Sequence, residues 1–348
     1  MNAKALILYL VRAGGLFALC RMLTRSAPRI LCYHGGSLGD EHLFNSKLFS
    51  RPGLLGQRLH WLKRKGFVPS TLDALVEPDD GHAREGIPLI VTLDDGWHSS
   101  AIDLLPVLAS HGYQPTLYLA TKVFASGGPV VDVCLRYIVW KSPLMQASLC
   151  GFDAVLDGSY VLGQNADRER LCTAAERWMA LCDDDVTSIL ARLELFAGAL
   201  KVPAGALDLA SRRFSYMSRE ELLDAVQQGC QIELHGHAHL YLTSQPERNR
   251  ADIETCRQHI VTLGLPLPRH YCYPSGAYDA QAPAMLASVD VSTATTCMPG
   301  LIHGVSEDRR YFLPRFLDGA DVSMIEFEAE MSGVLEFLRR FMRRSAPS

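Results

Sequence analysis

Carboxylates and imidazoles occur in this sequence at spacings that could bind a metal ion. One apolar run ends in Asp94 and Asp95, and another is followed by His235, His237 and His239. Neighbouring side chains on a strand point to opposite faces, so the two aspartates are expected to have different roles. His235 and His239 have the spacing that places two imidazoles on one side of a helical turn. Imidazoles with a carboxylate suit Zn²⁺, although Co, Ni and Fe remain open.

Short apolar runs that alternate with amphipathic stretches are expected to position these groups. The sequence predicts strands over 29–33, 87–93, 115–120 and 230–234, and helices over 52–65, 101–110 and 218–228. Short connections between them indicate parallel strands joined by helical crossovers, in an α/β fold that is either a barrel or an open sheet. Such folds place their active sites at the carboxyl ends of the strands, where both groups lie.

Three motifs together resemble the polysaccharide deacetylase family, also called the NodB-homology family or carbohydrate esterase family four. The first motif runs from Thr92 to Gly96, the second from His235 to His239, and the third is the Tyr-Pro-x-Gly turn of 273–276. Shorter similarities at 31–34, 295–300 and 313–315 extend the resemblance over about residues 29–316. The resemblance implies a distorted (β/α) barrel that hydrolyses an N-acetyl group of a sugar with a divalent metal.

The resemblance also implies a role for each matching residue. Asp95, His235 and His239 would hold the metal, and Asp94 would be the base that deprotonates a water molecule. His34, which ends the first strand, would be the acid that protonates the leaving amine. Two further histidines remain as alternatives: His237 for either histidine ligand and His303 for the acid.

Contacts to the substrate are less specific. Backbone N–H groups near Ser275 could stabilise an oxyanion, and Trp97 and Tyr273 could stack on a sugar, although packing explains such aromatic residues equally well. The third motif lacks the arginine that orients the catalytic aspartate in many members, because Cys272 occupies that position. Arg315 or Arg269 is the hypothetical replacement.

Composition limits the classes of partner. The 348 residues carry 34 basic and 38 acidic side chains and no long basic block, which argues against nucleic acid as a partner. The ten cysteines are scattered and form no Cys-x-x-Cys pair, so they are expected to be reduced thiols in a cytoplasmic protein.

We expect the deacetylase domain to span 29–320, with a mostly helical insertion at about 129–216 that covers one face. A basic amphipathic segment precedes it at 1–28, and a basic amphipathic helix follows at 321–348. No uncharged run is long enough to cross a bilayer. The two terminal segments could instead contact the inner face of the membrane peripherally, or the N-terminal one could pack on its own domain.

Three functions remain open from the sequence. The first is a metal-dependent N-deacetylase acting on a glycan of the cell envelope or on its lipid-linked precursor. The second keeps the metal site but cleaves O-acetyl esters or another linear amide. The third is a catalytically inactive glycan-binding scaffold, which the missing arginine of the third motif suggests.

Overall fold

The computed structural model describes residues 3–76, 85–181, 185–307 and 309–345, and they form two compact units. The larger unit consists of Met1–Gly96, Ser100–Lys122 and Arg219–Ser348, and the smaller one of Trp97–Ser99 and Val123–Ser218. The bounds of the smaller unit include the whole of the predicted insertion at 129–216. Whether it covers one face of the barrel stays a prediction.

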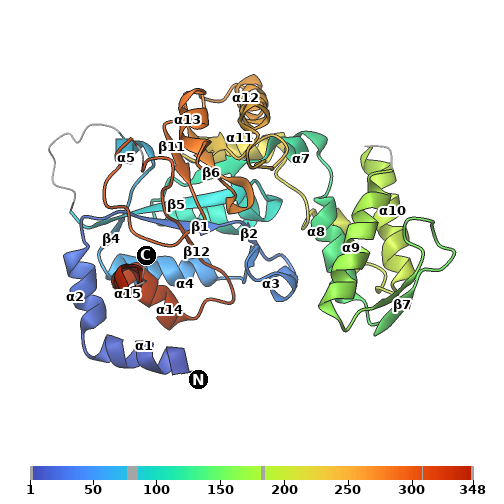
Figure 1. Cartoon of the computed structure of the whole chain (residues 1–348), viewed down its shortest axis with the longest axis horizontal. Helices are drawn as coiled ribbons and strands as arrows, with labels where there is room; N and C mark the ends of the chain where they lie inside the picture. The colour runs from blue at the N-terminus through green and yellow to red at the C-terminus, as the bar shows by residue number, and fades with distance from the viewer. Residues whose placement is uncertain (1–2, 77–84, 182–184, 308, 346–348) are drawn as a thin grey trace. The chain divides into compact units, whose positions relative to one another are not determined.

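A parallel sheet forms the centre of the larger unit (Figure 1). Its order is β11-β10-β9-β6-β5-β1-β12, and β4 pairs with the first residues of β5. The strands are β1 Arg29–Tyr33, β4 Phe67–Pro69, β5 Ile87–Asp95, β6 Thr116–Leu119, β9 Gln231–Leu234, β10 His270–Cys272, β11 Thr293–Thr295 and β12 Phe316–Leu317. A short pair, β2 Gly35–Gly36 with β3 Phe49–Ser50, lies beyond β1. All nine residues of β5 are buried, as expected for a central strand with both faces covered.

The chain just before β12 connects the two ends of this sheet. The Ala294 N–H donates to the Arg310 carbonyl and the Leu313 N–H donates to the Ala294 carbonyl, at 2.8 and 2.9 Å, while β12 pairs with β1. Side chains from β1, β5, β6 and β10 fill the interior, among them Ile30, Ile90 and Tyr118. The curled sheet with its surrounding helices confirms the predicted distorted (β/α) barrel.

Helices connect and surround the strands of this unit. They are α1 Ala3–Ala13, α2 Leu16–Leu23, α3 Glu41–Phe44, α4 Leu54–Arg64, α5 Asp73–Val76, the π-helix η1 Ser100–Leu104, α6 Leu105–Ser110, α11 Arg219–Gln227, α12 Pro246–Thr262, the 3-10 turn η3 Pro274–Gly276, α13 Ala282–Ala287, α14 Met324–Ser332 and α15 Val334–Ser345. The helix predicted over 101–110 therefore begins with a π-helical turn.

Each terminal segment consists of two helices and not of one. The first breaks at Gly15, whose φ is 79°, and the last breaks at Gly333, whose φ is 82°. Glycine adopts this left-handed conformation without the steric cost that a Cβ brings. Within the described residues no single helix is long and apolar enough to span a membrane, although α1 and α2, bent by 72°, reach that length and apolarity together.

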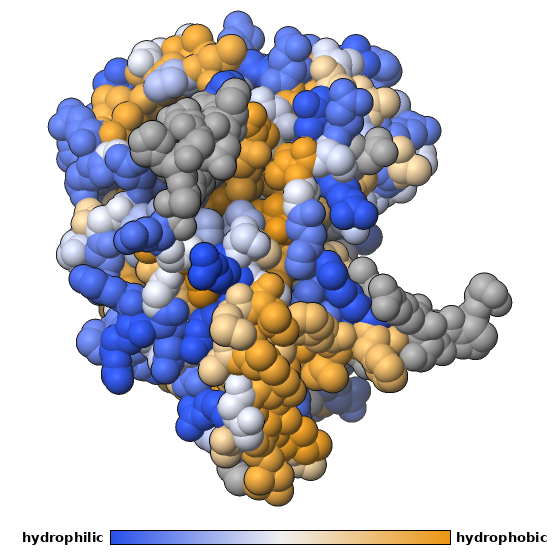
Figure 2. All heavy atoms as spheres, turned by 90° about the vertical axis from the view of Figure 1, so that its left-hand side faces the viewer, coloured by the Kyte–Doolittle hydropathy of each residue, from blue (hydrophilic) through white to orange (hydrophobic). Residues whose placement is uncertain are grey.

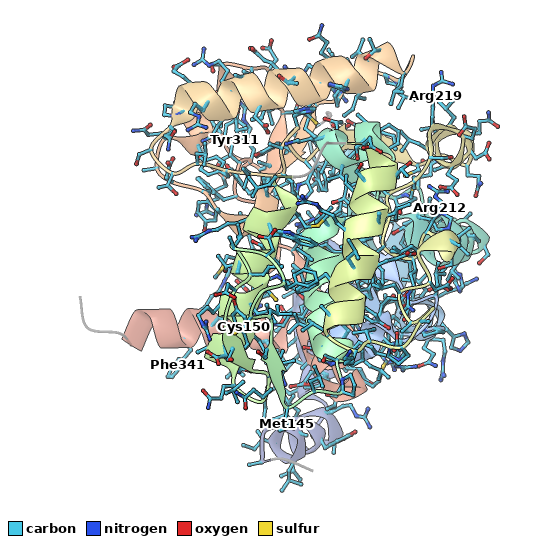
Figure 3. All side chains as sticks on the ribbon, turned by 90° about the vertical axis from the view of Figure 1, so that its right-hand side faces the viewer. Met145, Cys150, Arg212, Arg219, Tyr311 and Phe341 are labelled. Carbon is cyan, nitrogen blue, oxygen red and sulfur yellow. The ribbon has the colours of Figure 1, made fainter. Side chains whose placement is uncertain are left out.

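The smaller unit is mostly helical and contains one hairpin. Its elements are α8 Val131–Lys141, β7 Gln146–Ser148, β8 Ser159–Val161, α9 Asn165–Met179, α10 Val186–Ala199 and the 3-10 turn η2 Leu209–Ser211, and α7 Thr121–Ser126 joins it to the barrel unit. In Figure 3, Met145 and Cys150 flank β7 of the antiparallel hairpin. Asp185 caps α10 by accepting a 3.0 Å hydrogen bond from the Ser188 N–H.

An ionic cluster ties α5 to the amino ends of β9 and β10. Asp73 accepts hydrogen bonds from the side chains of Gln231 and Arg269, and its Oδ1 lies 3.1 Å from the Nε2 of His270. The hydrogen bond with His270 is the main cause that holds the pKa of Asp73 below its usual range, and it outweighs the opposing effect of burial.

We expect Asp73→Asn to lower the free energy of unfolding by about 1–2 kcal/mol near neutral pH. A carboxyl whose pKa is lowered in the folded state stabilises the fold above its unfolded pKa, about 3.9, and this contribution is lost as the pH falls through the folded value. Denaturant unfolding should therefore show the largest difference from wild type at neutral pH and a shrinking difference below about pH 4. The exposed Asp224→Asn is the matched control. An equal loss for both variants would contradict the prediction.

Candidate active site

The predicted site residues lie at the carboxyl ends of β1, β5 and β9. Asp94 and Asp95 end β5, His235 follows β9, and His34 follows β1. Asp94 continues the inward-facing series of Ile90 on β5. Asp95 has a φ of 73°, so the strand ends at that residue and its side chain does not follow the alternation. This turn allows two adjacent carboxylates to face one site.

Asp95, His235 and His239 converge as a candidate metal centre. Asp95 Oδ1 lies 3.2 Å from the Nε2 of His235 and 3.3 Å from the Nε2 of His239, and the three potential ligand atoms lie within 4.8 Å of one another. Asp95 and His235 are buried, whereas the side chain of His239 is 36% exposed. The centre is therefore rigid on one side and accessible on the other.

The hydrogen bond of His235 orients its second ring nitrogen toward Asp95, as in a metal ligand. Its Nδ1 lies 2.9 Å from the Cys272 carbonyl oxygen, which can only accept, so Nδ1 carries the hydrogen. The Nε2 of His235 then faces the Asp95 carboxylate at 3.2 Å, so either a proton on Nε2 or a bound metal ion separates the two atoms. An imidazole oriented by a carbonyl in this way is typical of a metal ligand.

Two imidazole nitrogens and one carboxylate oxygen fit a divalent transition metal with further coordination positions open. The donor set suits Zn²⁺ and does not distinguish it from Co, Ni or Fe. The predicted pair of histidine ligands is the pair that the structure brings together with Asp95.

Arg315 holds Asp94 in place beside this centre. Its two terminal nitrogens donate to Asp94 Oδ1 and Oδ2 at 2.7 and 2.8 Å, and both side chains are buried. Burial, the largest single effect, would raise the pKa of Asp94. The charge and hydrogen bonds of Arg315, together with nearby His235 and His34, outweigh burial and lower the pKa to about 2. Asp94 is therefore a carboxylate at neutral pH, and this bidentate geometry fixes its orientation.

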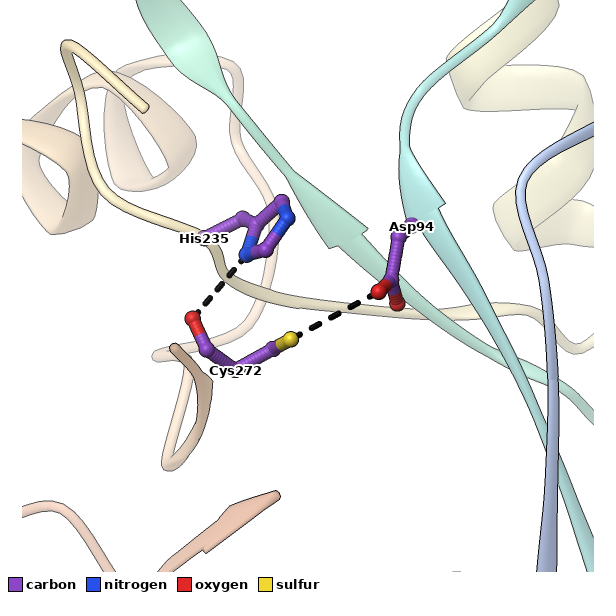
Figure 4. Close-up of side chains that lie close together, drawn as sticks. All are labelled: Asp94, His235 and Cys272. Carbon is purple, nitrogen blue, oxygen red and sulfur yellow. Dashed lines mark hydrogen bonds between the residues drawn. The ribbon is translucent and has the colours of Figure 1, made fainter. Parts of the chain in front are cut away.

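The structure thus shows which arginine replaces the one missing from the third motif. Arg315 contacts Asp94, whereas Arg269 pairs with Asp73 at the other end of the strands. Cys272 takes part as well, because its Sγ lies 3.6 Å from Asp94 Oδ2 and 3.0 Å from a nitrogen of Arg315. Figure 4 shows Cys272 between Asp94 and His235, with its thiol toward one and its carbonyl toward the other.

His34 lies beside Asp94 at the end of β1. Its Nε2 lies 3.9 Å from Asp94 Oδ2, and its side chain is 19% exposed. The preceding residue is anchored deep in the barrel, where the Tyr33 hydroxyl donates to Asp318 at 2.7 Å and Arg58 makes two further hydrogen bonds to that carboxylate. A rigid strand end therefore carries His34 to the site.

The two alternative histidines lie elsewhere. The Nδ1 of His237 is 3.0 Å from the Thr121 hydroxyl, and its ring stacks on His259. His303 lies 3.8 Å from Glu336 of α15. The candidate metal cluster contains neither of them, and the contacts of His303 are on the helix side of the barrel.

The predicted sugar-stacking residues do not offer a free ring face. Trp97 is buried and packs edge-on against Tyr216, with ring centroids 5.2 Å apart. Tyr273 is also buried, and its hydroxyl donates to the Tyr311 carbonyl at 3.0 Å. Both rings take part in the packing of the protein, so the structure favours packing, the second of the two alternatives for these residues. Ser275 is exposed after β10 and has a φ of 54°.

Sequence reasoning missed Asp252, which shapes the histidine loop from α12. Its two oxygens accept hydrogen bonds from the backbone N–H groups of His237 and Ala238, both at 2.8 Å. Gly236 allows this close approach, because a Cβ there would lie 2.6 Å from Asp252 Oδ2. No sequence motif marks Asp252, since it lies on an ordinary polar helix.

This arrangement defines a (β/α) barrel with a candidate hydrolytic centre at the carboxyl ends of its strands. A family model described as polysaccharide deacetylase matches residues 160–294, which include the histidine cluster and the third motif but not Asp94 or Asp95. No curated protein matches the sequence significantly.

Several solved structures share the fold. A deacetylase of Streptococcus pyogenes, PplD in complex with acetate, is 14% identical with a TM-score of 0.55, and the match covers 88% of this chain and 99% of that one. IcaB from Ammonifex degensii is 15% identical with a TM-score of 0.53, over 88% and 97% of the two chains. A de-N-acetylase from Aggregatibacter actinomycetemcomitans is 10% identical with a TM-score of 0.51, over 88% and 100%. These likenesses establish the fold.

The family match confirms the resemblance to the polysaccharide deacetylases that the three motifs predicted. The enzyme class that this similarity indicates is a carbohydrate deacetylase.

Proposed function

We propose that this protein is a metal-dependent hydrolase that removes an N-acetyl group from a sugar of a cell-envelope polysaccharide or of its lipid-linked precursor. The observation that carries the proposal is the convergence of Asp95, His235 and His239 beside a carboxylate, Asp94, that is not part of this ligand set. A hydrolase that uses a metal needs both parts: ligands for the ion and a separate base.

Each residue has a distinct role in the proposed reaction. A divalent ion held by Asp95, His235 and His239 would act as a Lewis acid on the acetyl carbonyl and would lower the pKa of water. Asp94, oriented by Arg315, accepts the proton of the attacking water.

The remaining steps concern the oxyanion and the leaving group. Protonated His34 donates a proton to the departing amine, and its partial exposure lets the substrate reach it. The backbone N–H of Ser275 is the proposed donor to the oxyanion.

Arg315 also bears on the alternative of an inactive scaffold. That alternative rested on the missing arginine of the third motif. Because Arg315 supplies the same charge to Asp94 from another part of the chain, the motif no longer argues against catalysis.

We propose that the reaction takes place on the cytoplasmic side of the membrane. All cysteines among the described residues are free, which suits a reducing compartment. Basic, apolar helices at both ends of the chain are compatible with a glycolipid substrate presented at the inner face of the membrane.

Removal and return of the metal test the proposed chemistry. Treatment with a chelator is expected to abolish acetate release from N-acetylglucosamine oligomers, and Zn²⁺ or Co²⁺ should restore it. O-acetylated sugars serve as the parallel substrate. Release from these alone would favour an esterase, and release unaffected by the chelator would exclude the metal-dependent mechanism. No release from either substrate above the level of Asp94→Asn would favour a scaffold.

A further inference from the structure

The outward face of the two terminal helical segments is unusually apolar. Helices α1, α2 and α15 of the barrel unit contribute Leu6, Ile7, Leu10, Leu16, Leu19, Met22, Leu23, Phe337, Leu338 and Phe341, all of them exposed. Figure 2 shows this docking face as a continuous orange surface in the lower part of the view, and Figure 3 labels Phe341 on α15. Exposed apolar surfaces of this extent mark interaction sites.

These helices do not need the docking face for their own packing. Their inner sides already form a small core in which Leu8 and Phe17 pack against Ile325 and Ala329 of α14. Helices that are apolar on the outer side as well as the inner one are typical of proteins whose second side contacts a partner or a membrane.

Ion pairs hold the helices in this orientation. Lys4 pairs with Glu326 at 2.6 Å, Arg12 with Glu328 at 3.1 Å, and Arg339 with Glu330 at 2.6 Å. All three carboxylates belong to α14, which lies beneath the docking face. The acidic groups of this region are therefore paired, and basic groups such as Arg25 remain at its edge.

The docking face also contains a groove between α2 and α15. Its volume is about 640 Å³, and it is lined mainly by apolar side chains, including Leu19, Leu23 and Phe337. Arg340 is the charged residue of the lining. Arg340 is itself paired with Glu336 at 2.9 Å, so the groove offers apolar contacts to an acyl chain while its own cation is already neutralised.

We infer that this docking face binds the surface of a lipid bilayer that contains anionic lipid. Residues 3–23 carry apolar and basic side chains, glycine, the hydroxyl of Tyr9 and the thiol of Cys20, without any acidic or amide group. A protein partner would be expected to need a rim of such groups for hydrogen bonds, whereas a lipid surface requires apolar insertion and positive charge. The inference goes beyond the proposed chemistry, because docking needs no catalytic group.

The test measures binding of the full chain to vesicles of phosphatidylglycerol and phosphatidylcholine in equal parts, by flotation. Leu10→Ser/Leu23→Ser is expected to weaken binding about 100-fold, because two leucines no longer insert. Leu195→Ser/Leu267→Ser is the matched control, since these leucines are 59% and 63% exposed, compared with 65% and 63% for Leu10 and Leu23, and lie outside the docking face. The control should bind as wild type.

Charge is tested in the same assay. Arg25→Glu should weaken binding about tenfold, because one cation is lost and one anion gained near the surface. Arg248→Glu on α12 should have no effect, and vesicles of phosphatidylcholine alone should bind more weakly than mixed vesicles. Equal binding of both leucine variants, or no binding of wild type, would overturn the inference.

Two further measurements separate the remaining outcomes. Sedimentation of the wild type and of Leu10→Ser/Leu23→Ser detects a dimer, and a dimer that only the substitution disrupts would assign the docking face to a second copy of the chain. Asp94→Asn should bind vesicles as wild type does. Vesicle binding without acetate release would therefore refute the proposed function and leave the docking face intact.

Discussion

Replacement of Asp94 by asparagine is expected to lower the rate of acetate release by about three orders of magnitude. The amide keeps the size of the side chain but cannot take a proton from water. Asp94 is outside the predicted ligand set, so the variant should retain its metal. Turnover of N-acetylglucosamine oligomers and metal content by elemental analysis are the two measurements.

A matched variant separates loss of the base from loss of the metal. His239→Ala removes the most exposed of the three candidate ligands, so it should reduce metal content together with activity. If Asp94→Asn lost its metal as well, Asp94 would have to be counted as a ligand. If it kept both metal and activity, the proton would have to go to another group, and His34 at 3.9 Å would be the next candidate.

The strand-end motifs could be predicted from sequence because their chemistry is local. Asp94 and Asp95 follow a long apolar run, and the histidines follow another, so the parallel α/β pattern alone brings them to one edge. The close agreement of β1 and β5 with the predicted strands has the same origin, since both strands are buried throughout.

Contacts made over long sequence separations could not be assigned in this way. Arg315 reaches Asp94 from 221 residues away, because the chain before β12 closes the barrel. The sequence could offer Arg315 and Arg269 only as equal alternatives. Stacking and packing could not be told apart for Trp97 and Tyr273 for a related reason, since an aromatic residue beside a catalytic motif has the same local pattern whether it is buried or exposed.

The ends of the chain show how much depends on single glycines. The amphipathic character of both terminal segments was visible in the sequence, but the breaks at Gly15 and Gly333 direct the helices into one packed group. The sequence does not show which apolar residues of these helices remain exposed, because that depends on which of them pack against α14.

Replacement of Arg315 by leucine is expected to lower the free energy of unfolding by about 3–5 kcal/mol. The loss exceeds that of the individual hydrogen bonds, because Asp94 would remain as a buried carboxylate without its cation. Arg315 also donates to the Thr296 carbonyl and the Thr92 hydroxyl, both at 3.1 Å, and these acceptors would lose their partner. Denaturant unfolding of the metal-free protein measures the change.

The double variant Asp94→Asn/Arg315→Leu distinguishes an unpaired charge from a simple loss of packing. If the buried carboxylate causes the instability, the double variant should be more stable than Arg315→Leu alone, since neutral asparagine costs less to bury than a charge. Arg315→Lys should fall between wild type and Arg315→Leu, because lysine keeps the charge but not the two-pronged geometry. Equal stability of Arg315→Leu and the double variant would mean that Arg315 contributes through its packing over Tyr118 and not through Asp94. The Cys272 thiol, which donates to Asp94 Oδ2, would then be the group that keeps the Asp94 carboxylate in its orientation.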